Sequence, residues 1–499
     1  MKKKYLGYFS LVFALLLSSC EEAYLDTTPT ASIDAGSAYA TTKNAAAAVN
    51  GIYRSFIVRY LSSQGHSGHP AMMIILDHMG EDMVLGTTAA SWHVGETRWT
   101  AHRSDVNTMV QFPYEMYYRI IGNANIGIAN LDKAVGPAAD RNSLKGEALA
   151  LRAFGYFNLV QLYGKRYDAT AKPNAQLGVP LVLEPTTEGK PRNTVEEVYA
   201  QINKDLAAAA ALLTTSRLNK SHINLSVVKG LQARVALVQQ DWTNAAKFAA
   251  EARAGYAPMT ATQYQDGFQD LTNSEWMWGF DHLEDQTEYF GAYHSYISCN
   301  YNSTVIRTYP KVINSLLYKQ IPTTDVRAKM WVETPTAANS IVPPGGVRPK
   351  FLNQKFRLPG TPSTSAQGDV PYMRAAEMYL IEAEAKARLN DATGASQVLF
   401  DLVKTRDASY VKSTKTGVAL IDEILLQRRI ELWGEGFSLF DIKRTGAGLN
   451  RPTGAGNHGA PNFNPVVYQL PAGAPQFLMR IPTRELNNNS KMTPADQNP

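Results

Sequence analysis

The side chains most suggestive of chemistry lie near the C-terminal end, where acids and arginines alternate. Two carboxylates at a defined separation in a cleft would be the machinery of glycoside hydrolysis. Here Glu431 and Asp441 each have an arginine three residues away, a spacing that brings opposite charges together across one helix turn. The pattern therefore favours structural ion pairs over a catalytic pair. The residues are Arg428, Glu431, Glu435, Asp441 and Arg444, and Glu147 with Arg152 is interpreted in the same way.

Two histidines, His66 and His69, have a spacing that some metal sites use. However, no cysteine or third histidine stands at a diagnostic interval, and the segment is polar. We therefore predict no bound metal and no cofactor. The chain also lacks a nucleophile elbow, a P-loop and a glycine-rich dinucleotide turn, so no covalent catalysis is predicted. The other potential ligands nearby are Asp77, His78, Glu81 and Asp82.

Aromatic side chains in polar, non-periodic segments are candidates for a sugar-binding surface. Sugars present flat C–H faces that stack on Trp and Tyr rings, while Asn, Asp or Arg side chains bind the hydroxyl groups. The alternative for each ring is a packing role as a partly buried loop anchor. The ligand-binding candidates are Trp92, His93, Tyr289, Tyr293, Tyr296 and Tyr301.

Other tryptophans fit packing roles better. Trp276 and Trp278 alternate around Met277 in a strand-like pattern, and we expect at least one of them to lie in the core. Trp242 sits in a predicted turn and Trp433 near a predicted helix end, so both are expected to pack.

Two helical hairpins are expected to position these groups. In residues 226–254, Ala233, Asp241 and Ala245 stand at offsets of eight and four. Residues 375–406 repeat this layout, with the same residue types at the same offsets. Small residues let two antiparallel helices approach closely, while aspartate tolerates the turn and caps the second helix. The arrangement resembles the tetratricopeptide hairpin, whose repeat is about 34 residues. The matching residues of the second copy are Ala383, Asp391 and Ala395.

Long insertions interrupt this helical pattern. Helical periodicity is present in residues 44–60 and is strongest in residues 143–163. Residues 61–105 lack clear periodicity and are predicted to be loops. A second insertion, residues 255–369, is rich in Trp, Tyr and Pro. Binding sites usually lie on such insertions, so the predicted fold is an all-α, tetratricopeptide-like superhelix with a loop-rich cap.

The N-terminal residues predict export and lipid attachment. A basic start precedes a short apolar run, which is typical of a secretory signal and too short for a bilayer span. Leu17-Ser18-Ser19-Cys20 looks like a bacterial lipobox, in which Cys20 becomes the lipidated first residue; an ordinary signal peptide is the alternative. Removal of residues 1–19 changes the formal net charge from +5 to near +2. Without a basic stripe, nucleic-acid binding has no electrostatic support.

A series of short motifs runs along the whole chain behind the lipobox. The motifs are Tyr24-Leu25-Asp26, Asn50-Gly51-Ile52-Tyr53, Tyr118-Arg119-Ile120-Ile121, Gly146 to Phe154, Met373 to Glu377, Gln427 to Leu432, Gly434-Glu435-Gly436 and Asp441 to Gly446. Each motif is weak singly, but in this order they resemble the SusD/RagB family of outer-membrane nutrient-binding lipoproteins of Bacteroidetes. The terminal Gln497-Asn498-Pro499 also matches, although the family's usual further Gly-Tyr is missing.

The resemblance implies a non-enzymatic binder at the cell surface. By family analogy, the protein captures oligosaccharide or another nutrient and delivers it to a TonB-dependent outer-membrane transporter of the SusC type. The ligand site in that family uses residues from the two inserted regions. A surface glycoside hydrolase and a peptide-binding helical scaffold are the alternatives. The implied division is 1–19 signal peptide, 20–240 N-terminal part and 241–499 C-terminal part, packed as one globular unit.

Overall fold

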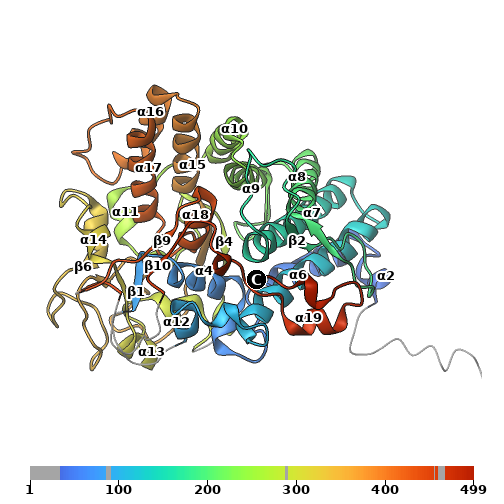
Figure 1. Ribbon diagram of the computed structural model, residues 1–499, viewed down its shortest axis with the longest axis horizontal. Helices are drawn as coiled ribbons and strands as arrows, with labels where there is room; N and C mark the ends of the chain where they lie inside the picture. The colour runs from blue at the N-terminus through green and yellow to red at the C-terminus, as the bar shows by residue number, and fades with distance from the viewer. Residues whose placement is uncertain (1–33, 86–91, 287–289, 455, 459–466) are drawn as a thin grey trace, which may run out of the picture.

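Helices packed side by side run across the molecule from upper left to right in Figure 1. This computed structural model describes residues 34–85, 92–286, 290–454, 456–458 and 467–499. Each helix packs against the next, and α10 packs against α15 although an insertion separates them in sequence. We call these helices the helical scaffold: α6 (Thr108–Asn130), α7 (Ala138–Tyr163), α8 (Val195–Leu212), α9 (Leu225–Val238), α10 (Trp242–Arg253), α15 (Ala375–Arg388), α16 (Ala392–Val403) and α17 (Gly417–Glu431).

The two predicted hairpins, α9–α10 and α15–α16, are confirmed, and their turns share one backbone geometry. Each turn contains a residue in the left-handed region, Gln240 at φ 61° and Asn390 at φ 64°. The next residue, Asp241 or Asp391, accepts a hydrogen bond from the backbone N–H three residues further on, at 3.1 Å and 2.8 Å. Both aspartates therefore cap the second helix as expected. The small residues at the helix contacts are fully buried, namely Ala233, Ala245, Ala383 and Ala395.

The first long helix of the described part is α3 (Thr42–Arg54), which follows the short α2 (Ala35–Ala38). It confirms most of the helix predicted in residues 44–60, and its apolar residues Val49 and Ile52 are buried. The helix ends before the predicted Tyr60 because the backbone oxygen of Phe56 accepts the N–H of His69 at 2.7 Å. The chain after α3 is therefore tied to the first insertion and leaves the helical conformation.

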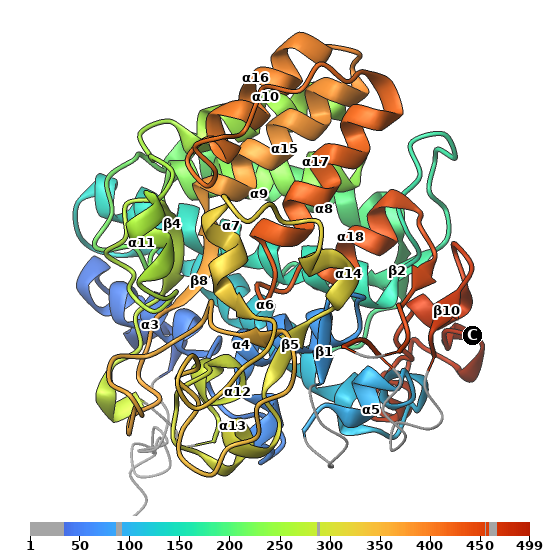
Figure 2. The same ribbon diagram turned by 90° about the vertical axis from the view of Figure 1, so that its left-hand side faces the viewer.

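The two insertions lie together below the scaffold in Figure 2, and an antiparallel sheet joins them in the order β1-β5-β7-β6. β1 comes from the first insertion and pairs Met83 with Ile313, while the other three strands come from the second. We call the described parts of residues 61–105 and 255–369 the insertion layer. Its sheet strands are β1 (Met83–Leu85), β5 (Lys311–Ile313), β6 (Trp331–Val332) and β7 (Leu352–Asn353).

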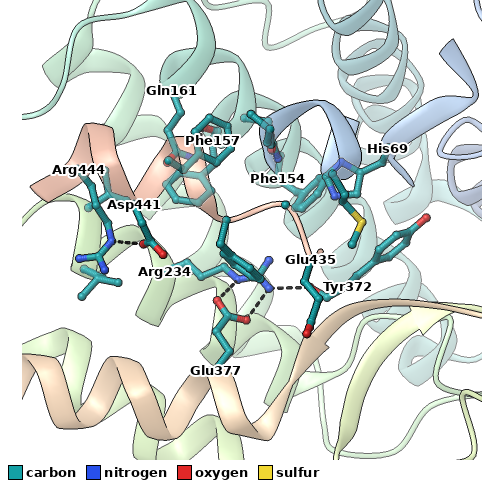
Figure 3. A pocket seen from close by; sticks show the side chains of 18 of the residues that line it. His69, Phe154, Phe157, Gln161, Arg234, Tyr372, Glu377, Glu435, Asp441 and Arg444 are labelled. Atoms are coloured by element: carbon teal, nitrogen blue, oxygen red, sulfur yellow. Dashed lines mark hydrogen bonds and ion pairs between the residues drawn. The ribbon is translucent and has the colours of Figure 1, made fainter. Parts of the chain in front are cut away.

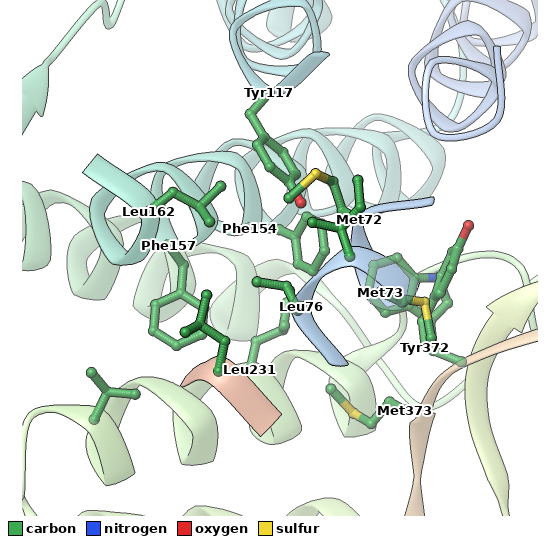
Figure 4. Close-up of a cluster of buried hydrophobic side chains, with 14 of the residues drawn as sticks. Met72, Met73, Leu76, Tyr117, Phe154, Phe157, Leu162, Leu231, Tyr372 and Met373 are labelled. Atoms are coloured by element: carbon green, nitrogen blue, oxygen red, sulfur yellow. The ribbon is translucent and has the colours of Figure 1, made fainter. Parts of the chain in front are cut away.

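A buried helix, α4 (Gly68–His78), lies in the first insertion, so the prediction of loops is wrong there. Every residue of α4 is buried. A helix covered on all sides has no polar face, and its sequence therefore lacks the periodicity of a surface helix. Figure 4 shows Met72 and Leu76 of α4 packed near Phe154 and Phe157 of α7. This contact anchors the first insertion in a core that it shares with the scaffold.

Short helices and strands complete the described part. β4 (Trp276–Phe280) pairs with β8 (Val370–Arg374), and both of its tryptophans are buried. The strand-like alternation therefore predicted β4 correctly. Other helices are α5 (Val94–Thr97), α11 (Ala261–Gln265), α12 (Tyr293–Ile297), α13 (Thr304–Thr308), α14 (Ser315–Tyr318), α18 (Ser438–Thr445) and α19 (Thr483–Asn488). Other strands are β2 (Leu177–Pro180), β3 (Arg192–Thr194), β9 (Leu449–Asn450) and β10 (Gln469–Leu470).

Cys299 follows α12 in the insertion layer and is a buried, unpaired thiol. Burial raises the pKa of this thiol to about 12. Its backbone N–H donates a hydrogen bond to the backbone oxygen of Phe356 at 3.0 Å. The thiol is therefore protonated and shielded at neutral pH, which makes it inert while the insertion layer stays closed.

Two features of the predicted organisation can be located only in part. The predicted signal peptide and the lipidation residue Cys20 lie outside the described residues. Within the described residues, no helix has both the length and the apolar character that a membrane span needs. The predicted boundary between residues 240 and 241 falls in the turn between α9 and α10.

Candidate functional site

Aromatic rings from both insertions meet at one point of the insertion layer. The ring centroid of Trp92 lies 5.1 Å from that of Tyr296 and 5.6 Å from that of Phe290, both in edge-to-face contact. The ring of His93 lies 5.3 Å from that of Tyr296. Such edge-to-face contacts are a favoured geometry for aromatic pairs. We call Trp92, His93, Phe290 and Tyr296 the aromatic cluster. The structure thus brings together three of the predicted ligand-binding residues.

The aromatic cluster has an exposed pair and a buried pair. Trp92 and Phe290 are partly exposed, whereas Tyr296 and His93 have exposed fractions of 1% and 8%. The hydroxyl of Tyr296 donates a hydrogen bond to the backbone oxygen of Gln64. His93 has a φ of 65°, an uncommon value for a residue other than glycine, and precedes α5. The buried ring of Tyr296 therefore supports Trp92, which in turn contacts Phe290.

The other predicted rings have different surroundings. Tyr293 is buried, and its hydroxyl donates to the backbone oxygen of Gly434. Tyr301 is also buried, and its backbone bridges to Ser363. Tyr289 lies outside the described residues. Because a buried ring has no open face, Tyr293 and Tyr301 pack against protein in this conformation and do not form a direct sugar platform.

Phe290 is the member of the cluster that sequence reasoning missed. The search for sugar-binding rings favoured Trp and Tyr, because their polar groups add hydrogen bonds to the stacking face. Two adjacent aromatic residues, Tyr289 and Phe290, followed by Gly291 in a polar segment could have indicated an exposed aromatic ring at this position. In the structure, Phe290 shares its exposed position with Trp92.

Buried, neutral histidines lie beside the aromatic cluster. The ring centroids of His78 and His93 are 6.1 Å apart. Burial lowers the pKa of His93 to about 3 and that of His66 to about 4. Burial also holds the pKa of His78 well below its usual value. These rings are therefore uncharged at neutral pH, and the exposed pair is supported by neutral side chains.

Three of the residues considered as metal ligands, His69, Asp77 and Asp82, have other partners. His69 shares a hydrogen bond with the hydroxyl of Tyr117 at 2.9 Å, and Asp82 pairs with Arg429 at 2.6 Å. Asp77 accepts the backbone N–H groups of Gly436 and Ser438, each at 3.1 Å. Within the part of the chain that the structure describes, no group of three or more His, Cys, Asp or Glu side chains is arranged to hold a metal ion.

Glu431 of the C-terminal motif lies in a buried network of ion pairs. Its carboxylate is 3.3 Å from Arg327, 3.1 Å from Arg374 and 3.0 Å from Arg406. Burial alone would raise the pKa of Glu431, but the three arginines outweigh it and hold the pKa well below its usual range. The general acid of a glycosidase needs a raised pKa, so Glu431 is unsuited to that role.

Structural ion pairing is confirmed for these motifs, but the predicted pairing within one helix turn is mostly wrong. Glu431 binds arginines from distant segments, and Glu147 and Arg152 do not pair with each other. Tertiary contacts bring oppositely charged groups together across elements, which sequence spacing does not reveal. The local pair is Arg444–Asp441 (2.6 Å); the pairs between elements include Arg428–Asp441 (2.7 Å), Arg374–Glu435 (2.6 Å), Glu147–His222 (2.8 Å) and Arg152–Asp205 (2.7 Å).

An internal cavity of about 70 Å³ lies among α4, α7, α9, α15 and α18 (Figure 3). Arg234 and Glu377 form a 2.6 Å ion pair on its wall, and Asp441 and Arg444 form another. The cavity is too small for a sugar ring and lies where α4 and α18 pack against the scaffold.

The fold and the aromatic cluster define a class of protein: a tetratricopeptide-like helical superhelix in which two insertions meet on one side. A solved structure from Bacteroides vulgatus, described as a SusD-like carbohydrate binding protein, has this fold with a TM-score of 0.79. It is 29% identical, and the match covers 92% of this chain and 98% of that one.

The chain belongs to the SusD/RagB family. The model of the SusD family matches residues 285–499. A second model, described as starch-binding and associating with the outer membrane, matches residues 57–237. SusD-like protein P2 of Formosa agariphila is 25% identical over 537 residues, with 99% of each chain covered. SusD-like protein P38 of the same organism is 26% identical over 378 residues and covers 66% of this chain and 71% of its own.

Proposed function

We propose that the protein is a cell-surface receptor that captures oligosaccharide on the exposed rings of Trp92 and Phe290. The observation that carries the proposal is the placement of these rings. They come from different insertions, they touch each other, and the buried ring of Tyr296 packs against Trp92. A fixed aromatic face costs little conformational entropy when it binds a sugar ring.

The descriptions of similar proteins support a carbohydrate ligand. The Bacteroides vulgatus protein, at 29% identity, is described as carbohydrate binding. The family model that matches residues 57–237 is described as starch-binding and associating with the outer membrane. This match includes Trp92. A glycan is therefore the ligand class that we propose, at the outer surface of an outer membrane.

Attachment and delivery complete the proposal. Lipidation of Cys20 would tether the protein to the membrane, with residues 21–33 between the anchor and α2. By family resemblance, the bound sugar passes to a TonB-dependent transporter of the SusC type. No covalent step is required for this role. The ion pairs around Glu431 also argue against a glycosidase built on the C-terminal acids.

Replacing Trp92 by Ala tests the proposal. The variant should lose about 1–3 kcal/mol of binding free energy for the glycan that the wild-type protein retains, because a stacking face is removed. Affinity electrophoresis on gels that contain starch, laminarin, xylan or mannan measures this loss. Phe290→Ala should act in the same direction, since the two rings form one surface.

Trp242→Ala is a matched control. Trp242 is also partly exposed, but it lies at the start of α10 and stacks with Arg388, whose guanidinium is 4.7 Å from the ring centroid. Its replacement should leave glycan retention unchanged. Equal retention of the Trp92 and Trp242 variants would refute the site. New reducing ends in the glycan would instead establish a hydrolase, and retardation by peptides alone would favour a peptide-binding scaffold.

A further inference from the structure

A second hollow in the surface lies between α6, α19 and the segment that follows β2. Its volume is about 640 Å³, which is within the range of about 300–1,000 Å³ typical of ligand sites. It shares no lining residue with the aromatic cluster. Figure 1 shows α6 and α19 at the lower right, and Arg484 of α19 pairs with Glu115 of α6 at 2.6 Å. We call this hollow the α6–α19 groove.

One face of α6 forms the floor of the groove. Gln111, Glu115, Tyr118 and Gly122 line it at successive spacings of four, three and four residues, which places them on one stripe of a helix. All four are partly exposed. The hydroxyl of Tyr118 donates to the backbone oxygen of Pro180 at 2.8 Å, which fixes the ring. The floor therefore carries one fixed aromatic ring among polar side chains.

Gly122 leaves open space on the floor beside Tyr118. A Cβ atom at Gly122 would meet no other atom within 4 Å. Glycine in a helix costs about 1 kcal/mol relative to alanine, so it weakens α6 without relieving any crowding. The consequence is an uncovered stretch of helix backbone one turn from the tyrosine ring.

Polar side chains form the walls, and their charges cancel. The walls meet where the side-chain amide of Asn489 donates to the backbone oxygen of Lys190 at 2.9 Å. Glu115, Glu188 and Glu485 supply the acids, and Arg119, Lys190 and Arg484 supply the bases. A balanced lining gives no net attraction for a highly charged ligand. Further hydrogen-bonding groups are Thr186, Thr187, Asn488 and Gln111.

We infer that the α6–α19 groove is a second binding site for a neutral, polyhydroxylated chain, a segment of a polysaccharide. Amide, hydroxyl, carboxylate and guanidinium groups match the donors and acceptors of sugar hydroxyls, and Tyr118 offers the flat face. A peptide would instead need a free strand edge or a row of apolar pockets. This inference rests on the proposed function and adds that one long glycan contacts the protein at two places.

Filling the groove tests this inference. Gly122→Trp should place an indole over the floor, and Gly51→Trp is the matched control. Gly51 is also a helical glycine at which a Cβ would have no neighbour within 4 Å, but it lies on α3, away from the groove. Both variants should keep the thermal stability of the wild type. Gly122→Trp should bind the retained polysaccharide at least fivefold more weakly, because linked contacts reinforce each other. Gly51→Trp should bind it as the wild type does.

The possible results test the groove and the aromatic cluster independently of each other. Wild-type affinity of Gly122→Trp, with weak binding by Trp92→Ala, would overturn the groove and leave the proposed function standing. The reverse result would support the groove and refute the cluster. If Gly122→Trp does not fold, chemical acetylation of Lys190 in the wild-type protein is the second test. Slower acetylation of Lys190 in the presence of the polysaccharide would support the groove as a binding site. An unchanged rate of acetylation would overturn the inference. Protection of Lys190 by peptides alone would overturn it too, as would a wild-type protein that binds no polysaccharide.

Discussion

In the helical scaffold, small residues recur at fixed offsets and let neighbouring helices touch, whereas the insertion layer is held by single contacts between distant residues. Ala233 and Ala383 occupy equivalent places in two hairpins and are both fully buried. By contrast, the indole N–H of Trp433 donates to the backbone oxygen of Asp82 at 2.9 Å, across more than 300 residues. A repeated pattern stabilises one region, and individual long-range contacts stabilise the other.

The two regions also differ in their buried ionisable groups. Burial lowers the pKa of His294 to about 4, as it does for His66. In the scaffold, burial alone would raise the pKa of Glu384, but Arg444 and Arg388 lower it to about 2. Both regions bury paired charges, such as Arg327 with Asp325 at 2.7 Å in the insertion layer, but most of the buried neutral histidines lie in the insertion layer. The histidines of the insertion layer are His66, His69, His78, His93, His102, His282 and His294.

Lowering the pH should destabilise the insertion layer more than the helical scaffold, and this is the largest effect that we expect. The folded-state pKa of these histidines lies below the unfolded value of about 6.5, so the unfolded state binds more protons between the two values. Their contribution is complete above pH 6.5 and is lost as the pH falls toward about 4. At pH 5 the loss is about 2 kcal/mol each for His66 and His294.

Four carboxyl groups of the insertion layer oppose this trend, because burial raises the pKa of Asp77, Glu81, Glu96 and Asp369. Burial raises the pKa of Asp77 and of Glu96 to about 7, so these groups favour folding more as the pH falls below 7. They are outnumbered by the buried histidines. Hydrogen exchange at pH 7 and pH 5, corrected for intrinsic rates, should show α4 and α12 opening more often at pH 5 while α15 changes little. Equal changes in α4 and α15 would contradict the comparison.

Glu431→Gln should destabilise the junction between the two regions by about 3–5 kcal/mol, because it removes one negative charge from a buried network that contains three arginines. Arg327 belongs to the insertion layer and Arg406 follows α16, so Glu431 connects both. Urea unfolding measures the change. Glu423→Gln, on the same helix, is the control: Glu423 pairs with the half-exposed Lys415, and the loss should be about 1 kcal/mol or less. Similar losses in both variants would show that the network is not the junction.

Asp391→Ala and Asp241→Ala should have the smallest effects, about 1 kcal/mol each, through loss of a helix N-cap. Because the two turns have the same backbone geometry, the two losses should agree to within a few tenths of a kcal/mol. Thermal unfolding measures both. A large difference between the two losses would mean that the hairpins are not equivalent in energy, despite their equal spacing.

The sequence predicts the scaffold well because local rules govern it. The periodic segment 143–163 lies within α7, and the aspartates of both hairpins cap helices as their spacing indicates. The sequence fails at α4, where complete burial removes the periodicity on which a helix prediction depends. It also fails at Glu431, since the partners of a buried charge are chosen by tertiary structure.

The candidate site is predictable only as a region. Both insertions contribute to the aromatic cluster, as the positions of Trp92 and Tyr296 suggested. The burial of Tyr296 was not predictable, because a tyrosine with a polar partner serves a core as well as a surface. The exposure of Phe290 depends on packing between segments about 200 residues apart, so it cannot be predicted from the residues next to Phe290 in the sequence.

Labelling of the buried thiol of Cys299 offers a way to measure how often the surrounding part of the insertion layer opens. A thiol reagent can react only with the thiolate, and only after the surrounding segment has opened. When the reagent is in excess and modifies each exposed thiol before the segment recloses, the labelling rate equals the rate constant of opening. Because Cys299 is the single cysteine within the described residues, its modification reports on this one region. The labelling rate of Cys299 therefore measures how often the segment around α12 opens.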